Sequence, residues 1–259
     1  MTPAQTLGWC WRLIMTGFCF LMFGVGGLLL TLLLSAVLLL RRGARRQWIA
    51  RHLISGAFRF FLWAAARLGV LEFRLRGAEK LRADRGCLVV ANHPTLIDYV
   101  MLAAVVPTLD CVVKAEVLSN PFFGGVIRAA GYLVNNRAET FLDDCRARLA
   151  QGACILIFPE GTRTRPGQAI SLQRGAAQVA VRCPSDVRLV AIHCSEAILA
   201  KHSHWYDVPA RKPVFTVSVG DRLSPGVLFS DTRPEPSVAA RRLTRVLAER
   251  LTQGLQGLS

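Results

Sequence analysis

Uncharged apolar positions dominate the N-terminal quarter of the chain. The run from Leu13 to Leu40 contains no charged residue, and about 20 apolar residues in a helix suffice to cross a bilayer core. A second apolar stretch, residues 53–71, is interrupted by Arg59 and Arg67. At that spacing the two arginines share one helical face. This favours an interfacial amphipathic helix whose arginines reach water, with an ordinary core helix as the alternative.

After residue 85, short apolar runs alternate with stretches of helical periodicity. We predict a strand that begins at 154 and others at 87–92, 111–115, 132–136, 187–194 and 213–220. We predict helices at 95–106, 121–131, 139–152, 172–183 and 237–256. This alternation predicts an α/β fold with a mostly parallel sheet flanked by helices. We therefore expect two units, membrane-embedded and interfacial helices in residues 1–72 and an α/β domain in residues 73–259.

The charge balance indicates an anionic partner. The formal net charge is +15 and the pI is about 10.5. Residues 41–85 hold twelve Arg or Lys against three acidic residues, so the excess lies beside the apolar helices. Anionic lipid headgroups explain that placement more simply than nucleic acid does, and the chain carries no nucleic-acid-binding motif.

The basic cluster RRGARR, directly after Leu40, bears on orientation. A signal peptide would have a shorter apolar core followed by a small-residue cleavage site, whereas here arginines follow at once. Positive charge on this side predicts that the chain from Arg41 onward is cytoplasmic. Whether residues 13–40 span the bilayer or enter only one leaflet stays open.

The cysteine and histidine pattern does not point to a metal site. The eight cysteines include no C-x-x-C pair, and most lie in apolar runs as small hydrophobic residues. His202 and His204 lie close together in a polar segment without an evident third ligand. We therefore predict no metal cofactor.

The stretch ANHPTLID, residues 91–98, places His93 at a strand end and Asp98 shortly after it. Proline disfavours the α region for the preceding residue and suits the first turn of a helix, so we expect a helix beginning at Pro94. His93 can then fold back onto Asp98, whose carboxylate would fix the tautomer and leave the other ring nitrogen as a base. A helix cap without catalytic role is the alternative.

Two further stretches place cations near strand ends. FPEGTRTRPG, residues 158–167, carries Glu160, Gly161 and Arg163 after a buried strand. Arginine offers a planar fork for phosphate, although a solvated loop is the alternative. Lys114 and Arg137 add cations at the edges of two more strands. A base and cations at three strand ends suit acyl transfer to a phosphate-bearing alcohol.

These stretches together resemble the lysophospholipid acyltransferase family, which includes the 1-acylglycerol-3-phosphate acyltransferases, over roughly residues 40–220. The H-x-x-x-x-D motif is present as His93 and Asp98, and F-P-E-G-T-R-[ST] as Phe158 to Thr164. The family's K-x-E-L…P-x-F-G…G…R motif is matched by Lys114, Glu116, Pro121, Phe123, Gly124, Gly131 and Arg137. Three motifs in this order, behind an apolar N-terminus, make the resemblance specific.

The resemblance implies a membrane-bound enzyme in which His93 is the general base on the acceptor hydroxyl and Asp98 orients it. The implied substrate-binding residues are Lys114, Arg137, Glu160, Gly161, Thr162, Arg163 and Arg174. The acyl donor would be a thioester of CoA or acyl carrier protein, with no metal or cofactor required. An apolar groove near the membrane would hold the acyl chain, and 1-acylglycerol-3-phosphate would be converted to phosphatidic acid.

The chain departs from the family pattern at three places. Asn136 stands where many members have an acidic residue, Arg174 is the lone cation after the third motif, and the strand VRLVAIHC lacks the family's proline. The acceptor therefore stays open among 1-acylglycerol-3-phosphate, another lysolipid, an aminolipid and a specialised lipid. A non-catalytic protein that binds anionic lipid through the same fold is the alternative from another functional class.

Overall fold

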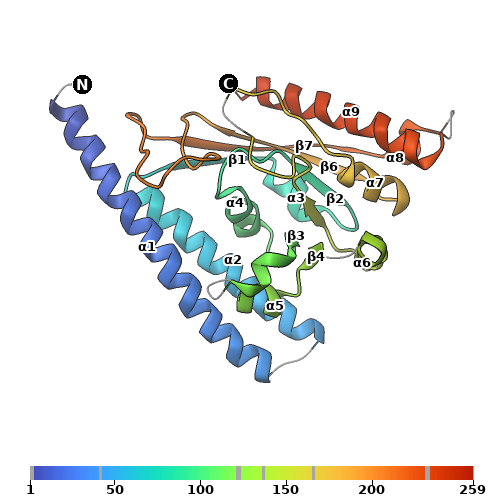
Figure 1. The fold of residues 1–259 in the computed structure, drawn as a ribbon, viewed down its shortest axis with the longest axis horizontal. Helices are drawn as coiled ribbons and strands as arrows, with labels where there is room; N and C mark the ends of the chain where they lie inside the picture. The colour runs from blue at the N-terminus through green and yellow to red at the C-terminus, as the bar shows by residue number, and fades with distance from the viewer. Residues whose placement is uncertain are drawn as a thin grey trace.

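The computed structural model describes residues 3–40, 43–120, 124–135, 138–164, 167–230 and 234–258. A seven-stranded sheet carries helices on both faces, and two long N-terminal helices run alongside each other at one edge of the molecule (Figure 1). The strands are β1 (Glu72–Arg76), β2 (Leu88–Ala91), β3 (Asp110–Lys114), β4 (Leu133–Asn135), β5 (Ile155–Ile157), β6 (Val187–Cys194) and β7 (Val214–Leu223). The helices are α1 (Pro3–Leu40), α2 (Gly43–Arg67), α3 (Ala78–Ala83), α4 (Asp98–Val105), the 3-10 helix η1 (Ala115–Ser119), α5 (Gly124–Ala130), α6 (Ala138–Ala150), α7 (Gly175–Arg182), α8 (Pro225–Leu228) and α9 (Pro236–Gln256).

The sheet has the strand order β1-β7-β6-β2-β5-β3-β4. All neighbouring strands run parallel except β6 and β7, which pair antiparallel. The prediction of a mostly parallel sheet flanked by helices is therefore confirmed. This order also brings the carboxyl ends of β2, β5 and β3 side by side at one edge, where sheets of this kind bind their ligands.

The edge strand β1 is an element that the sequence analysis missed. Its charged residues alternate with Phe73 and Leu75, a pattern typical of a half-buried strand. It pairs in parallel with β7, with Phe73 beside Phe215. Five residues are too few for alternation alone to separate a strand from a loop, and the pairing partner lies far along the chain.

Alternate residues of β2 face two separate hydrophobic layers. Val89 and Ala91 point into the layer shared with α2 and α4, while Leu88 and Val90 point into the layer beneath α6, α7 and α9. All four side chains are fully buried. Burial on both faces explains the uninterrupted apolar sequence of β2 and places this strand at the centre of the fold.

The helix predicted to begin at Pro94 begins instead at Asp98, so that prediction is wrong. Residues 95–97 form turns ahead of α4, and Ile97 is its N-cap residue. The Asp98 carboxylate accepts hydrogen bonds from the Thr95 N–H, at 2.8 Å, and from the Thr95 hydroxyl. These bonds close a turn before the helix, and Asp98 is the first residue of α4.

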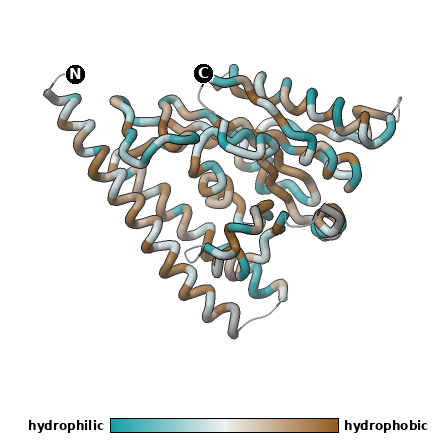
Figure 2. The backbone as a smooth tube through the Cα atoms, in the orientation of Figure 1, coloured by the Kyte–Doolittle hydropathy of each residue, from teal (hydrophilic) through white to brown (hydrophobic). Residues whose placement is uncertain are grey.

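The apolar N-terminus forms α1, in which residues Gln5–Val37 are long and apolar enough to cross a membrane by length and composition. Figure 2 shows brown or pale colour along most of α1, whereas α9 alternates between brown and teal. The neighbouring helix α2 packs on both α1 and α4 and contributes Leu62 and Ala65 to the core that includes the sheet. The division into two domains at residue 72 stays a prediction.

The helix α2 combines the two interpretations considered for residues 53–71. Its inner face buries Leu62, as a core helix does, while its outer face exposes Phe60 and Trp63. Arg59 and Arg67 are also exposed, and the Arg67 guanidinium lies 5.8 Å from the centre of the Trp63 ring. An aromatic and basic outer face is the composition expected of a helix at a membrane interface.

Part of the basic charge in residues 41–85 is neutralised within the protein. Arg51 of α2 is 8% exposed and pairs with the fully buried Asp110 at the start of β3. Lys80 of α3 lies 2.8 Å from Asp221. Anionic headgroups therefore cannot account for every cation of this segment.

Candidate active site

The residues of the three sequence motifs converge at one edge of the sheet. β2 lies between β6 and β5, and β3 lies on the other side of β5. The segments that follow these strands therefore start next to one another, with His93 after β2, Glu160 after β5 and Lys114 at the end of β3. The sequence placed these residues at strand ends, and the strand order brings those ends together.

His93 and Asp98 form a hydrogen-bonded pair. His93 Nδ1 lies 2.7 Å from Asp98 Oδ2, and the side chain of Asp98 is completely buried while that of His93 is 24% exposed. Because Nδ1 is engaged with the carboxylate, Nε2 is the ring nitrogen left to act on another group. The fold-back of His93 onto Asp98 that the sequence analysis predicted is therefore present.

Asp98 is a buried acceptor whose hydrogen bonds come from a single turn. Burial raises the pKa of the Asp98 carboxyl above its ordinary value, while the hydrogen bonds from His93 and Thr95 act in the opposite direction. The Thr95 hydroxyl and N–H bind the carboxylate, so its orientation toward His93 is fixed. A carboxylate held in this way can select one imidazole tautomer.

The loop after β5 holds the backbone of His93 from both sides. The His93 N–H donates to Glu160 Oε1 at 2.6 Å, and the Thr164 N–H donates to the His93 carbonyl at 3.0 Å. The Phe158 ring stacks on the imidazole, with 4.3 Å between ring centroids and 22° between planes. The third motif thus positions the histidine of the first motif, a link between segments that spacing in the sequence does not reveal.

Glu160 is buried with one carboxylate oxygen unpaired. Its Oε2 atom has no hydrogen-bond partner in the described part of the chain. Burial raises the pKa of the Glu160 carboxyl, and the hydrogen bond from the His93 N–H partly offsets this. Burial of an acceptor without a hydrogen-bond partner destabilises a folded protein. Such a group is often found at functional sites, where a bound ligand can supply the missing hydrogen bond.

The substitution Glu160→Gln is expected to leave the melting temperature at neutral pH unchanged or higher, while lowering kcat/KM if the carboxylate binds substrate as predicted. The amide keeps an oxygen to accept the His93 N–H and removes a buried charge. Because the pKa of Glu160 is raised on folding, ionisation disfavours the folded state. This penalty is full above the folded-state pKa and vanishes below the unfolded value of about 4.3.

Thermal unfolding across this pH range tests the prediction. Any excess stability of Glu160→Gln should shrink as the pH falls toward the unfolded-state pKa, because the wild-type carboxyl is then protonated in both states. A variant that melts well below the wild type at neutral pH would show that the charged carboxylate stabilises the fold, and would contradict the prediction.

The remaining predicted substrate-binding residues fall into three groups. Gly161 has a φ of +71°, a left-handed conformation that glycine adopts without steric strain, and Thr162 beside it is exposed. Arg174 is exposed directly before α7. Lys114 is the last residue of β3, and Arg137 lies outside the described residues. Their predicted roles in binding substrate stay predictions.

The sequence favoured Arg163 as a guanidinium open to bind phosphate, but the structure engages part of this group within the protein. Its Nη1 donates to the carbonyls of Leu199 and Ala200, at 2.9 and 3.0 Å. The guanidinium thus ties the loop after β5 to the long loop between β6 and β7. The Nη1 atom of Arg163 therefore binds the protein's own backbone. That the other guanidinium nitrogens bind phosphate stays a prediction.

Two further residues shape the site without having been singled out from the sequence. Asn92 of the ANHPTLID stretch is buried, and its side chain exchanges hydrogen bonds with the backbone of Ile192 in β6, at 2.8 and 2.7 Å. It thereby continues the ladder between β2 and β6 past the end of β2. Thr95 fixes Asp98 as described above. A polar residue directly after an apolar strand was the signal available for Asn92.

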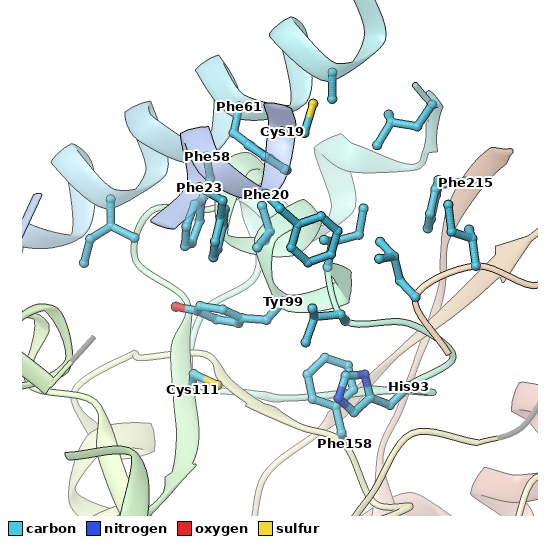
Figure 3. A pocket seen from close by; sticks show the side chains of 18 of the residues that line it. Cys19, Phe20, Phe23, Phe58, Phe61, His93, Tyr99, Cys111, Phe158 and Phe215 are labelled. Atoms are coloured by element: carbon cyan, nitrogen blue, oxygen red, sulfur yellow. The ribbon is translucent and has the colours of Figure 1, made fainter. Parts of the chain in front are cut away.

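An apolar cavity of about 610 Å³ adjoins His93. Figure 3 shows His93 and Phe158 on one side of it and a group of phenyl rings from α1 and α2 on the other. Those rings are Phe20, Phe23, Phe58 and Phe61. The cavity extends to Cys111 on β3 and to Tyr99 on α4. A base at the wall of an apolar cavity of this kind can act on a molecule that carries a long hydrocarbon chain.

Comparison with known proteins agrees with this geometry. Residues 72–195 match the family model described as Acyltransferase. Residues 72–195 belong to the acyltransferase family. The acyltransferase match runs from β1 to just past β6 and includes His93, Asp98 and Glu160, whereas α1 and α2, which close the cavity, precede it.

Relatives within the acyltransferase family are similar over part of their length. The 1-acyl-sn-glycerol-3-phosphate acyltransferase of Pseudomonas aeruginosa is 28% identical over 150 residues, which is 54% of this chain and 57% of that protein. The lyso-ornithine lipid O-acyltransferase of Rhizobium meliloti is 29% identical over 144 residues, 52% of this chain and 46% of that protein. The chain spans about half the length of the curated relatives it matches.

A solved acyltransferase has the same fold over nearly the whole chain. The crystal structure of the 1-acyl-sn-glycerophosphate acyltransferase PlsC from Thermotoga maritima aligns with a TM-score of 0.70, covering 95% of this chain and 97% of that chain at 23% identity. The coverage includes the N-terminal helices as well as the sheet. At this level of identity the likeness establishes the architecture.

Proposed function

We propose that this protein is a membrane-bound O-acyltransferase that moves a fatty acyl group from a thioester to the hydroxyl of a lysophospholipid. 1-Acylglycerol-3-phosphate, which would give phosphatidic acid, is the foremost acceptor, because several relatives carry that activity in their names. The observation that carries the proposal is the pairing of His93 with the buried Asp98 at the wall of an apolar cavity.

In the proposed reaction, His93 Nε2 takes the proton from the acceptor hydroxyl as the oxygen attacks the thioester carbonyl. The new ester bond forms, the carbon–sulfur bond breaks, and the thiolate leaves and regains a proton. Asp98 holds Nδ1 and stabilises the charge that develops on the imidazole. The acyl chain lies in the cavity between α1, α2 and the sheet. The donor is the thioester of CoA or of acyl carrier protein, and no step uses a metal.

The phosphate of the acceptor would lie near the loop after β5. Glu160 and Gly161 stand there beside His93, and Thr162 and Arg174 are exposed on the same segment. Lys114 and Arg137 are the further cations proposed to bind this phosphate. The net charge of +15 favours attraction of anionic substrates to this surface and to anionic lipid around it.

A lysolipid with another headgroup is the second candidate acceptor. The similarity to a lyso-ornithine lipid O-acyltransferase favours it, as do the departures from the family pattern in the strand β6 and after the third motif. Acyl transfer through His93 would be the same reaction, because the headgroup lies away from the attacking hydroxyl.

We propose that α1 lies along one leaflet, with the catalytic domain on the cytoplasmic side. Trp9 Nε1 donates to the Val208 carbonyl at 2.9 Å, and Thr31 packs against Gly125 of α5. These contacts are about 33 Å apart along the helix at 1.5 Å per residue, close to the thickness of a bilayer core. Since both ends touch the same domain, a spanning α1 would draw that domain into the bilayer.

An acyl-transfer assay tests the proposed function. Detergent-solubilised protein would receive labelled acyl-CoA, and separately acyl carrier protein thioester, with lysophosphatidic acid, lyso-ornithine lipid and other lysolipids. We expect transfer to lysophosphatidic acid. Transfer only to another lysolipid would select the second candidate, and no transfer from either donor to any acceptor by folded protein would overturn the proposal.

A further inference from the structure

The tryptophans of this chain are confined to three elements. Two lie on α1 and two on α2, and the fifth lies in the loop 195–213 between β6 and β7, here called the β6–β7 loop. The five are Trp9, Trp11, Trp48, Trp63 and Trp205. Tryptophan favours the interfacial region of membranes, where its ring is apolar and its N–H stays hydrated. The β6–β7 loop therefore shares with the two N-terminal helices a residue type that favours the membrane interface.

The outer face of α1 is a continuous apolar stripe. Large side chains recur there at alternating spacings of three and four and are between 42% and 74% exposed, namely Leu7, Trp11, Ile14, Phe18, Leu21, Val25, Leu28 and Leu32. Thr16, Cys19 and Phe23 lie on the opposite face and line the cavity. A regular helix with one face on the protein and one apolar face outward is suited to lie in a membrane interface.

The β6–β7 loop flanks this stripe. A Cβ atom at Gly17 would come within 3.1 Å of the Trp205 ring, so the indole lies directly on the α1 backbone. At 100° per residue, Gly17 is about 80° from the centre of the stripe, on the side away from Trp11. Trp11 Nε1 instead donates to the carbonyl of Leu68 just beyond α2. The stripe therefore runs between α2 on one side and the β6–β7 loop on the other.

The same loop forms part of the active-site entrance. Leu199 lines the cavity beside His93, and its carbonyl accepts the Leu96 N–H at 3.1 Å and the Arg163 guanidinium. Leu96 also lines the cavity and is 52% exposed. Farther along the loop, Trp205 and Tyr206 are 49% and 50% exposed. An apolar surface thus leads from α1 across the loop to the cavity.

We propose that the β6–β7 loop is a third membrane-contact element, which inserts Trp205 and Tyr206 into the interfacial region of the bilayer beside α1. The cavity entrance then lies at the lipid surface, so that a lysolipid moves from the leaflet to His93 without crossing water. This inference rests on the proposed membrane-bound acyl transfer. It adds a contact surface, outside the N-terminal helices, that governs access of bilayer-embedded substrate.

Emission from Trp205 reports directly on this contact. The contribution of Trp205 is the difference between the wild type and Trp205→Phe, a substitution that keeps an aromatic ring against Gly17. On vesicles of phosphatidylglycerol and phosphatidylcholine, this emission should be quenched by lipids brominated near the headgroup and protected from aqueous iodide. Equal iodide quenching with and without vesicles would overturn the proposal. Protection that follows protein concentration without lipid would assign the surface to a second copy and would also overturn it.

Activity on embedded substrate gives an independent test. Trp205→Glu should lower turnover of lysolipid in vesicles by about tenfold, since a charge replaces a large apolar contact, while turnover in detergent micelles stays within about twofold. Val227→Glu is the control, because Val227 is 75% exposed on α8, at the end of the molecule away from α1 (Figure 1). It should change neither rate.

These outcomes separate the inference from the proposed function. Equal loss in vesicles and micelles for Trp205→Glu would give the loop a purely structural role and overturn the inference while acyl transfer stands. No transfer by the wild type in either medium would overturn the proposed function, and the emission measurement would still decide whether the loop contacts lipid.

Discussion

The substitution His93→Ala is expected to lower kcat/KM for acyl transfer by about 10²–10⁴-fold, the usual contribution of a positioned general base. No other described residue at the cavity wall combines an imidazole with a buried carboxylate partner. The side chain is partly exposed to the cavity and its backbone bonds to Glu160 and Thr164 do not involve the ring. The fold should therefore survive the change, and the melting temperature should move little.

Two companion variants sharpen this test. Asp98→Asn should also reduce kcat/KM by about 10²-fold or more, because an amide no longer selects the tautomer that leaves Nε2 free. His52→Ala is the matched control, since His52 lies on α2 with Nδ1 2.8 Å from the Trp48 carbonyl and does not line the cavity. A folded His93→Ala enzyme with wild-type kcat/KM would remove the residue from the mechanism.

The substitution Asp110→Asn should have the largest effect on stability, about 3–5 kcal/mol of unfolding free energy. Asp110 is completely buried, and its carboxylate pairs with Arg51 of α2 and, at 3.1 Å, with Arg148 of α6. Removing the charge leaves two cations near the core without their counter-charge. The expected fall in melting temperature is roughly 10 °C or more, measured by thermal unfolding in detergent.

A surface pair supplies the control for Asp110. Asp221 lies 2.8 Å from Lys80, but its side chain is 92% exposed, and exposed pairs contribute at most about 1 kcal/mol. Asp221→Asn should therefore shift the melting temperature by only a few degrees. An equally small shift in melting temperature for Asp110→Asn would contradict the prediction. It would mean that water solvates the two cations and that the ion pair does not stabilise the packing of α2 on the sheet.

The sequence by itself determined which residues carry the family motifs and much of the local structure of this protein. Unbroken apolar runs defined α1 and the buried strand β2, because the period and length of such runs depend on neighbours along the chain. The extended conformation of His93 after β2 was also predicted, since proline disfavours the α region for the residue before it, but the helix expected at Pro94 begins only at Asp98. His93 and Asp98 lie close enough in sequence for their pairing to be inferred.

Only the tertiary structure decided which distant groups meet. Arg51 and Asp110 look like a membrane-facing cation and an ordinary strand residue, yet folding pairs them in the core. Arg163 binds the carbonyl of Leu199, and because every residue has a backbone carbonyl, no sequence pattern identifies this one as the partner. The cavity exists because α1 and α2 close over the sheet edge. Such contacts depend on strand order and helix packing, which bring together segments far apart in the chain. A local sequence pattern cannot predict them, because it depends only on residues near one another in the sequence.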